Sequence, residues 1–300
     1  KANMNLEQSQ FEMLKKLELF KDDHFKLLSY CSQRKIDFLS SPFDDGSFEF
    51  LADSLKLTRI KLGSGEITNG PMLMKIAQRG IELILSTGMS TLGDIETALG
   101  CLAFGYLKIE TQPTIEDFIN VYSKPEALEI LKKKVVLLHC TSEYPAPVKD
   151  VNLRVIPTLI DVFGIPVGYS DHTQSTVIPS AAVALGAEVI EKHFTLGREM
   201  KGPDHKASIE PNEFKSMVNN IRDVENALGG SRKIVTSMEW GNRKLVRKAV
   251  YAKDKIKTGE TITADKIMAK RPADGNSPML FWSYIEKKAD KDYDPDDAIR

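Results

Sequence analysis

The sequence has few cysteines, no long apolar run and almost no net charge, and each absence excludes a class of protein. Cys31, Cys101 and Cys140 are far apart and form no C-x-x-C pair, so we expect reduced thiols packed in the core of a cytoplasmic protein. No apolar stretch reaches the roughly 20 residues of a membrane span. A formal net charge of -1 gives no sign of the basic surface that nucleic acid requires.

The remaining composition is that of a globular protein. Apolar residues make up 42% of the 300 residues and charged residues 28%, which argues against disordered and fibrous classes. The length favours about two domains.

Six short apolar runs, each followed by small polar residues and then a helical pattern, predict repeated strand-helix units. The runs are nearly continuous in apolar residues rather than alternating, as in buried parallel strands. They span residues 36–43, 58–66, 82–89, 135–145, 165–173 and 188–196. Helix signals follow at Pro71, at Thr91 with Asp94, and between Pro211 and Gly229. Residues 104–134 are too long for a connection and predict an insertion with helices near Ile115 and Leu128.

Repeated units of this kind suit either an open doubly wound sheet or a (β/α)₈ barrel. Polar residues end every run, and a barrel would gather all of them at one mouth, so we favour the barrel. After Gly230 the sequence changes to short β-like runs and tight turns without a long helical period. We therefore expect a barrel domain over residues 1–236 and a small, mostly β domain over residues 237–300.

Two histidines at the ends of consecutive predicted strands are the candidate metal ligands. His172 lies in SDHT and His193 in EKHF, and two imidazoles suit a divalent metal with open positions. The alternative for each is a hydrogen-bonded structural histidine. Glu191 lies two residues before His193 and therefore on the same side of its strand. Glu191 could be a metal ligand, a base or a hydrogen-bond partner for a substrate hydroxyl, or it could form a buried ion pair with Lys61 or another basic group.

Other polar residues at the strand ends are suited to an anion or a sugar. Lys61, Ser64, Ser86 and Ser170 offer a positive charge and hydroxyl donors, although a serine taken alone is more often a turn or cap residue. The segments GSGE and STGM match neither a Walker A loop nor a dinucleotide fingerprint. Asp204, in the loop KGPDH, could bind sugar hydroxyls or be a solvated turn residue.

Two further histidines look structural. We expect His205 to be a loop residue and His139 to be packed in the core, although His139 could supply a third imidazole.

Taken in order, KLGSGEITN, ILSTGM, LLHCTSEYPAP, VGYSDHT, VIEKHFTL, GPDHKAS and KRPADG strongly resemble the bacterial sialic acid synthase family. This family includes N-acetylneuraminate, legionaminate and pseudaminate synthases, and the resemblance runs from about Leu6 to the end. It implies a (β/α)₈ barrel followed by an antifreeze-like SAF domain, in a domain-swapped homodimer. The implied reaction condenses phosphoenolpyruvate with an N-acetylmannosamine-type amino sugar to a nine-carbon nonulosonic acid and releases phosphate. Mn²⁺ or Mg²⁺ would bind to His172 and His193.

The resemblance also implies roles for individual residues. The positions that match phosphoenolpyruvate-binding residues are Lys61, Ser64, Ser86, Ser170 and Ser142, the last of which stands where some members have Asn. Those that line the site or touch sugar hydroxyls are Tyr144 and the candidate catalytic carboxylates Glu66, Glu191 and Asp204. Arg271, in KRPADG, matches an arginine that reaches the N-acetyl group from the partner's small domain.

One part of the family pattern is absent from this sequence. The resemblance places a catalytic Glu on the first strand, in an EIGxNHxG-like motif, and a Lys in a KFQ-like motif on the second. The six visible runs would then be the third to eighth strands, so we expect the natural protein to carry two more βα units at its N-terminus. Intact mass spectrometry tests this expectation, and a mass of 33.5 kDa would contradict it. Without those units we expect no catalysis.

Two rival functions fit the same residues. A metal-dependent aldolase or sugar isomerase could use two histidines and a carboxylate on the same barrel. A non-enzymatic sugar- or ice-binding protein is the other reading, prompted by the antifreeze-like domain. The long insertion and the segment KRPADGNSPM are closer to legionaminate or bacterial neuraminate synthases than to the animal enzyme.

Overall fold

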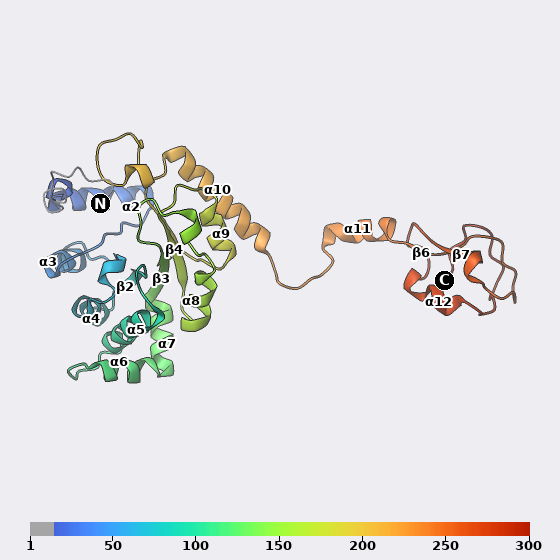
Figure 1. The fold of residues 1–300 in the computed structure, drawn as a ribbon, viewed down its shortest axis with the longest axis horizontal. Coiled ribbons are helices and arrows are strands. Elements are labelled where there is room, and N and C mark those ends of the chain that lie inside the picture. The colour runs from blue at the N-terminus through green and yellow to red at the C-terminus, as the bar shows by residue number, and fades with distance from the viewer. Residues whose placement is uncertain (1–14) are drawn as a thin grey trace. The chain divides into compact units, whose positions relative to one another are not determined.

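The computed structural model describes residues 15–300, so Leu6, where the resemblance begins, lies outside the described residues. The chain divides into two compact units between Gly229 and Gly230 (Figure 1). The units are described separately below. The domain boundary near Ser237 stays a prediction.

The first unit is built on a curled parallel sheet of five strands, a half-barrel (Figure 1). The strands are β1 (Arg59–Leu62), β2 (Glu82–Ser86), β3 (Val135–Cys140), β4 (Val167–Asp171) and β5 (Ile190–Lys192), paired in chain order. Each lies within one of the predicted runs. The expected α/β class with a parallel sheet is thus confirmed.

The strand expected at residues 36–43 was wrong. This segment has no regular secondary structure, and its contact with β1 is a single backbone bond of 3.4 Å from Lys61 N–H to Ser40 O. Ile36 and Phe43 are 65% and 70% exposed, so their apolar side chains gain no burial that would hold the segment against the sheet. An apolar run forms a strand only where its backbone can pair with a neighbouring strand along its length and its apolar side chains can be buried.

Helices follow the strands, and the sequence signals for their ends hold. The helices are α2 (Lys21–Arg34), α3 (Asp45–Glu49), α4 (Gly70–Gln78), α5 (Leu92–Tyr106), α6 (Ile115–Tyr122), α7 (Pro125–Lys134), α8 (Val155–Phe163), α9 (Ile178–Ala184) and α10 (Pro211–Leu228). Pro71 lies in the first turn of α4, and Thr91 and Asp94 form a reciprocal capping box at α5. Gly229 ends α10, and the predicted insertion contains α6 and α7. In the described chain, no helix is both long and apolar enough to cross a membrane.

The two faces of the sheet differ in chemistry because side chains alternate along each strand. The face that packs in the core with the helices carries Ile60, Leu62, Leu83, Leu85, Leu137, Val167 and Tyr169. The opposite, inner face carries Lys61, Ser86, Cys140, Ser170 and Glu191, as the register between neighbouring strands shows. The polar groups of the sheet therefore meet on its concave side near the carboxyl ends.

The second unit contains the helix α11 (Ser237–Val246), the antiparallel strands β6 (Ala249–Ala252) and β7 (Ile267–Lys270), and the short helix α12 (Phe281–Tyr284). Isolated bridges such as Ile256 with Tyr293 extend the pairing around a small apolar core. The region predicted to lack a long helical period contains the 10-residue helix α11, which starts at a capping box formed by Thr236 and Glu239.

Candidate functional site

A cavity of about 370 Å³ opens at the carboxyl ends of β1 to β4. Its lining comes from strand ends and the loops that follow them: Ser41, Phe43, Lys61, Gly63, Ser64, Gly65, Ser86, Met89, Cys140, Ser142, Tyr144, Ser170 and His172. All five of the predicted anion-binding residues are in this set. The structure therefore brings them to one place, as expected of strand ends in a barrel-like sheet.

The two candidate metal ligands lie side by side. The ring centroids of His172 and His193 are 5.3 Å apart, and the ring of Tyr144 lies 4.2 Å from the first and 5.5 Å from the second. His172 is buried, whereas His193 is partly exposed. Three rings from three different loops thus meet at the edge of the cavity.

Hydrogen bonding fixes which nitrogen of His172 is available. Its Nδ1 lies 2.7 Å from the carbonyl oxygen of Thr141, which can only accept, so the proton of the neutral ring is assigned to Nδ1. Burial lowers the pKa of His172 and favours that neutral ring. Nε2 then keeps its lone pair, 3.3 Å from Ser170 Oγ. A backbone carbonyl behind the ring is the usual arrangement of a metal-binding histidine.

These imidazoles fit two positions of a divalent metal site. Among residues 15–300, however, no three or more His, Cys, Asp or Glu side chains form a cluster that could hold a metal ion. The remaining positions would fall to water or substrate, as in sites that keep open positions for chemistry.

Glu191 is the centre of a polar network on the inner face. Its Oε1 accepts a hydrogen bond of 2.6 Å from Ser170 Oγ and lies 3.2 Å from Lys61 Nζ. Of the roles left open for Glu191, the ion pair with Lys61 is present. Its roles as a metal ligand, a base or a partner for a substrate hydroxyl stay predictions. The network connects Lys61 on β1 to Ser170 on β4 through Glu191 on β5, and it ends beside His172.

The serines around the cavity include one without a partner. Ser86 is 2% exposed, and its Oγ has no hydrogen-bond partner among the described residues. Ser64 Oγ accepts from Gly88 N–H at 2.9 Å and lies 3.1 Å from Cys140 Sγ. Because a buried hydroxyl is rarely left unsatisfied, the Ser86 hydroxyl indicates a place for a polar ligand.

Gly88 is packed too tightly against these groups to carry a side chain. A Cβ there would lie 2.3 Å from Ser142 Oγ, 2.8 Å from Ser64 Oγ and 2.9 Å from Cys140 Sγ. The sequence reading missed this role, although the glycine of STGM was the available signal.

Three further predicted site residues are not among those that line the cavity. Glu66 does not line the cavity, and its Oε2 accepts from Asn69 Nδ2 at 2.7 Å. Asp204 begins a short 3₁₀ helix, and its negative charge adds to the effect of burial in raising the pKa of Tyr144. Arg271 belongs to the second unit, where its Nε donates to Val246 O at 2.6 Å.

The histidines expected to be structural have structural partners. His139 is buried, stacks on Tyr169 at 5.9 Å, and its Nε2 lies 2.7 Å from Val151 O. His205 lies in the loop after β5, where its Nδ1 is 2.8 Å from Thr195 Oγ1.

A buried ion pair beside the histidines was also missed. Asp171 and Lys192 have side chains that are 0% and 1% exposed, and Lys192 Nζ donates to Asp171 Oδ2 at 2.6 Å. Burial lowers the pKa of Lys192. Their positions next to His172 and His193 in SDHT and EKHF were the available signal.

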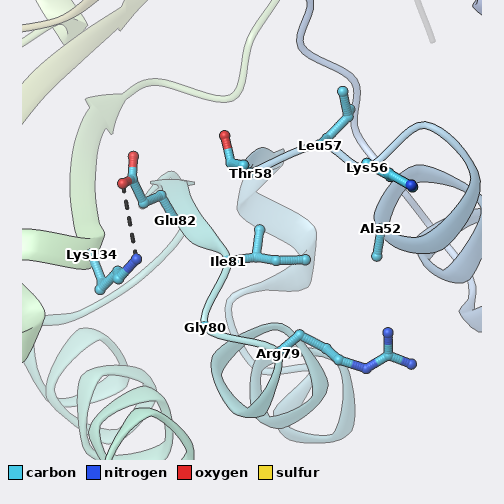
Figure 2. Close-up of a pocket in the computed structure, with 9 residues that line it drawn as sticks. All are labelled: Ala52, Lys56, Leu57, Thr58, Arg79, Gly80, Ile81, Glu82 and Lys134. Carbon is cyan, nitrogen blue, oxygen red and sulfur yellow. Dashed lines mark ion pairs between the residues drawn. The ribbon is translucent and has the colours of Figure 1, made fainter.

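A second cavity, of about 450 Å³, lies where β1 and β2 begin, at the opposite ends of these strands from the histidines (Figure 2). Its charged groups do not converge. Lys134 pairs with Glu82 at 3.9 Å, while Arg79 points away from Glu82 in Figure 2 and pairs with Asp53 at 2.5 Å. The cavity at the carboxyl ends of the strands, beside the histidines, is therefore the stronger candidate site.

A curled parallel α/β sheet with imidazoles, a carboxylate and hydroxyls at its carboxyl ends resembles the catalytic face of barrel enzymes. The comparisons with known proteins narrow this class. Residues 1–233 match the model of the NeuB family. The chain is 44% identical over 294 residues to N,N'-diacetyllegionaminic acid synthase of Campylobacter jejuni, an alignment that covers 98% of this chain and 81% of that protein. It is 40% identical to the Legionella pneumophila protein of the same name, covering 93% of this chain and 72% of that one.

Solved structures agree with the sequence comparisons. The N-acetylneuraminic acid (sialic acid) synthetase of Leptospira borgpetersenii, solved with citrate, is 30% identical and superposes with a TM-score of 0.63 over 77% of this chain and 72% of that one. The Bacillus subtilis spore coat polysaccharide biosynthesis protein spsE is 28% identical, with a TM-score of 0.60 over 99% of this chain and 81% of that one. The chain belongs to the NeuB family, the family of the sialic acid synthases.

Proposed function

We propose that this protein condenses phosphoenolpyruvate with an N-acetylmannosamine-type amino sugar, giving a nine-carbon nonulosonic acid and phosphate. The observation that carries the proposal is the network of Lys61, Glu191 and Ser170 beside His172. Lys61, Ser170 and His172 line one cavity. Membership of the NeuB family and the names of the relatives supply the reaction.

Phosphoenolpyruvate carries a carboxylate and a phosphate, and the cavity offers donors for both. Lys61 supplies a positive charge, and Ser64, Ser86, Ser142 and Ser170 supply hydroxyls. The Ser86 hydroxyl, which lacks a partner within residues 15–300, would gain one from the bound anion.

A divalent cation, Mn²⁺ or Mg²⁺, fits His172 and His193, where it would polarise the sugar aldehyde as a Lewis acid. His172 contributes Nε2, because Thr141 O holds the proton on Nδ1. Tyr144 lies against both rings and limits how far they can turn.

The reaction joins C3 of the enol ester to the aldehyde carbon of the open-chain sugar. Positive charge develops at C2, water adds there, and phosphate leaves. The protein must hold the negative groups of the substrate and take up the water proton, and a carboxylate suits that task. Among the residues present, Glu191 is closest to the anion-binding groups, while Glu66 and Asp204 are the further candidates.

The remaining features of the family form part of the same proposal. The five strands would belong to a closed (β/α)₈ barrel, residues 237–300 to an SAF domain, and the active form to a domain-swapped homodimer in which Arg271 meets the partner's sugar. Free thiols at Cys31, Cys101 and Cys140 support a cytoplasmic location. The two relatives named N,N'-diacetyllegionaminic acid synthase favour a diacetamido sugar.

Phosphate release by the purified natural protein with Mn²⁺ tests the function. We expect release only when phosphoenolpyruvate and an N-acetylated hexosamine are both present, and faster with 2,4-diacetamido-2,4,6-trideoxymannose than with N-acetylmannosamine. Cleavage or isomerisation of a sugar without phosphoenolpyruvate would favour the aldolase or isomerase instead. A binding protein would be favoured if the parent shows no turnover and His172→Ala still binds the sugar.

A further inference from the structure

The ion pair of Asp171 and Lys192 lies on the opposite face of the sheet from the histidines. Asp171 and Lys192 are register partners on β4 and β5, and His172 and His193 follow them by one residue each. Because side chains alternate, the ion pair faces the helix-covered side while the imidazoles face the cavity side.

The pair is fully satisfied, which is unusual for buried charges. Lys192 Nζ donates to Asp171 Oδ2 at 2.6 Å, to Ser175 O at 3.3 Å and to Thr173 O, so all three of its protons have acceptors. Asp171 Oδ1 accepts from Thr173 N–H at 2.8 Å and from Tyr169 OH at 3.1 Å. These contacts tie together the backbone on both sides of His172.

Stability alone does not account for such a pair. Two buried charges lose their hydration, and well-packed apolar residues of similar size usually serve a fold as well or better. A fixed register between β4 and β5 is what the pair adds, because its geometry is satisfied in a single alignment of the strands.

We propose that Asp171 and Lys192 are positioning residues that set the separation of His172 and His193 for divalent-cation binding. This inference rests on the metal site of the proposed function. The loss of the pair leaves both imidazoles in place but loosens the backbone that carries them. Metal affinity therefore falls without loss of the fold.

The experiment measures binding of Mn²⁺ alone by electron paramagnetic resonance, with thermal unfolding recorded for every variant. We expect Asp171→Leu/Lys192→Met to unfold as cooperatively as the parent. We expect it to bind Mn²⁺ at least about 10-fold more weakly, which is the typical effect of removing residues that orient metal ligands. The matched control is Arg59→Met/Glu82→Gln, which removes another cross-strand ion pair in register, between β1 and β2 where these strands begin. We expect its Mn²⁺ affinity to equal that of the parent.

A second variant guards against misfolding. Asp171→Asn/Lys192→Met keeps the acceptor for Thr173 N–H, and we expect a smaller loss of Mn²⁺ affinity. Hydrogen exchange on the parent needs no substitution, and we expect the Thr173 amide to exchange slowly and to slow further with Mn²⁺. Parental affinity in a folded double variant, or fast exchange at Thr173, would overturn the inference. A parent that binds no Mn²⁺ would instead overturn the metal site on which the inference rests.

Discussion

Ser170 and Glu191 are register partners on β4 and β5, and the Ser170 hydroxyl donates to the Glu191 carboxylate over 2.6 Å. The same carboxylate oxygen lies 3.2 Å from Lys61 Nζ. A substrate anion that approaches Lys61 must therefore share or displace this carboxylate, which couples anion binding to the position of Glu191. This coupling gives the first prediction.

Lys61→Met should raise the KM for phosphoenolpyruvate about 10-fold to 100-fold, because a hydrogen bond to a charged group contributes about 1.5–3 kcal/mol. Glu191 would then keep only its bond from Ser170. Steady-state kinetics with varied phosphoenolpyruvate measure the effect. Lys75→Met, which removes a surface ion pair with Asp45, is the control and should leave KM unchanged. An unchanged KM in Lys61→Met would mean that the lysine does not bind this substrate.

Ser86→Ala should stabilise the protein and weaken catalysis. The Ser86 hydroxyl is buried without a partner in the described part of the chain, and such a group costs about 1–3 kcal/mol. We expect the free energy of unfolding in urea to rise by about 1 kcal/mol and the KM for phosphoenolpyruvate to increase. A destabilised variant with normal KM would show that the hydroxyl serves the fold rather than the ligand.

Gly88→Ala should impair the site through steric pressure. The added Cβ would displace the Ser142 and Ser64 hydroxyls, and we expect kcat/KM to fall by at least about 10-fold, the equivalent of 1.4 kcal/mol. Gly93→Ala is the matched control, since its Cβ would meet only Thr91 Oγ1 at an ordinary 3.8 Å. Equal activity of the Gly88 and Gly93 variants would contradict this account.

The free energy of unfolding should decrease as the pH is lowered below about 6.5, the ordinary pKa of histidine. Burial lowers the pKa of both His139 and His172. The unfolded chain therefore takes up protons that the folded chain resists, and the free energy of unfolding falls by up to about 1.4 kcal/mol per pH unit for each group. Above this pH both rings are neutral in either state and the effect disappears. Urea unfolding between pH 5 and 8 measures the slope, and His139→Gln should reduce it. A slope that His139→Gln leaves unchanged would assign the effect to other groups.

The sequence predicted the parallel strands and helix ends well, because their signals are local. Apolar runs mark β1 to β5, and Thr91 with Asp94 and Gly229 mark helix ends that the structure reproduces. The segment 36–43 carries the same apolar signal, yet a strand also needs a neighbour along its whole length, which no single run reveals. The helix α11 was missed because a capping box at Thr236 and Glu239 outweighs the turn-like composition around it.

The residues of the candidate site could be predicted from the sequence better than the contacts between them. Strand-end positions identified His172, His193, Glu191 and Lys61, since parallel strands bring their carboxyl ends together. The unpartnered hydroxyl of Ser86 and the close approach to Gly88 depend on packing between distant segments, so they needed coordinates.

The most direct test of the proposed reaction is the fate of C3 of phosphoenolpyruvate. The protein is incubated with Mn²⁺, an N-acetylated hexosamine and phosphoenolpyruvate labelled with ¹³C at C3, and followed by NMR. We predict that the vinyl signal is replaced by the ring methylene of a nine-carbon acid, in step with phosphate release. A pyruvate methyl signal in its place would show hydrolysis without carbon–carbon bond formation and would contradict the proposed function.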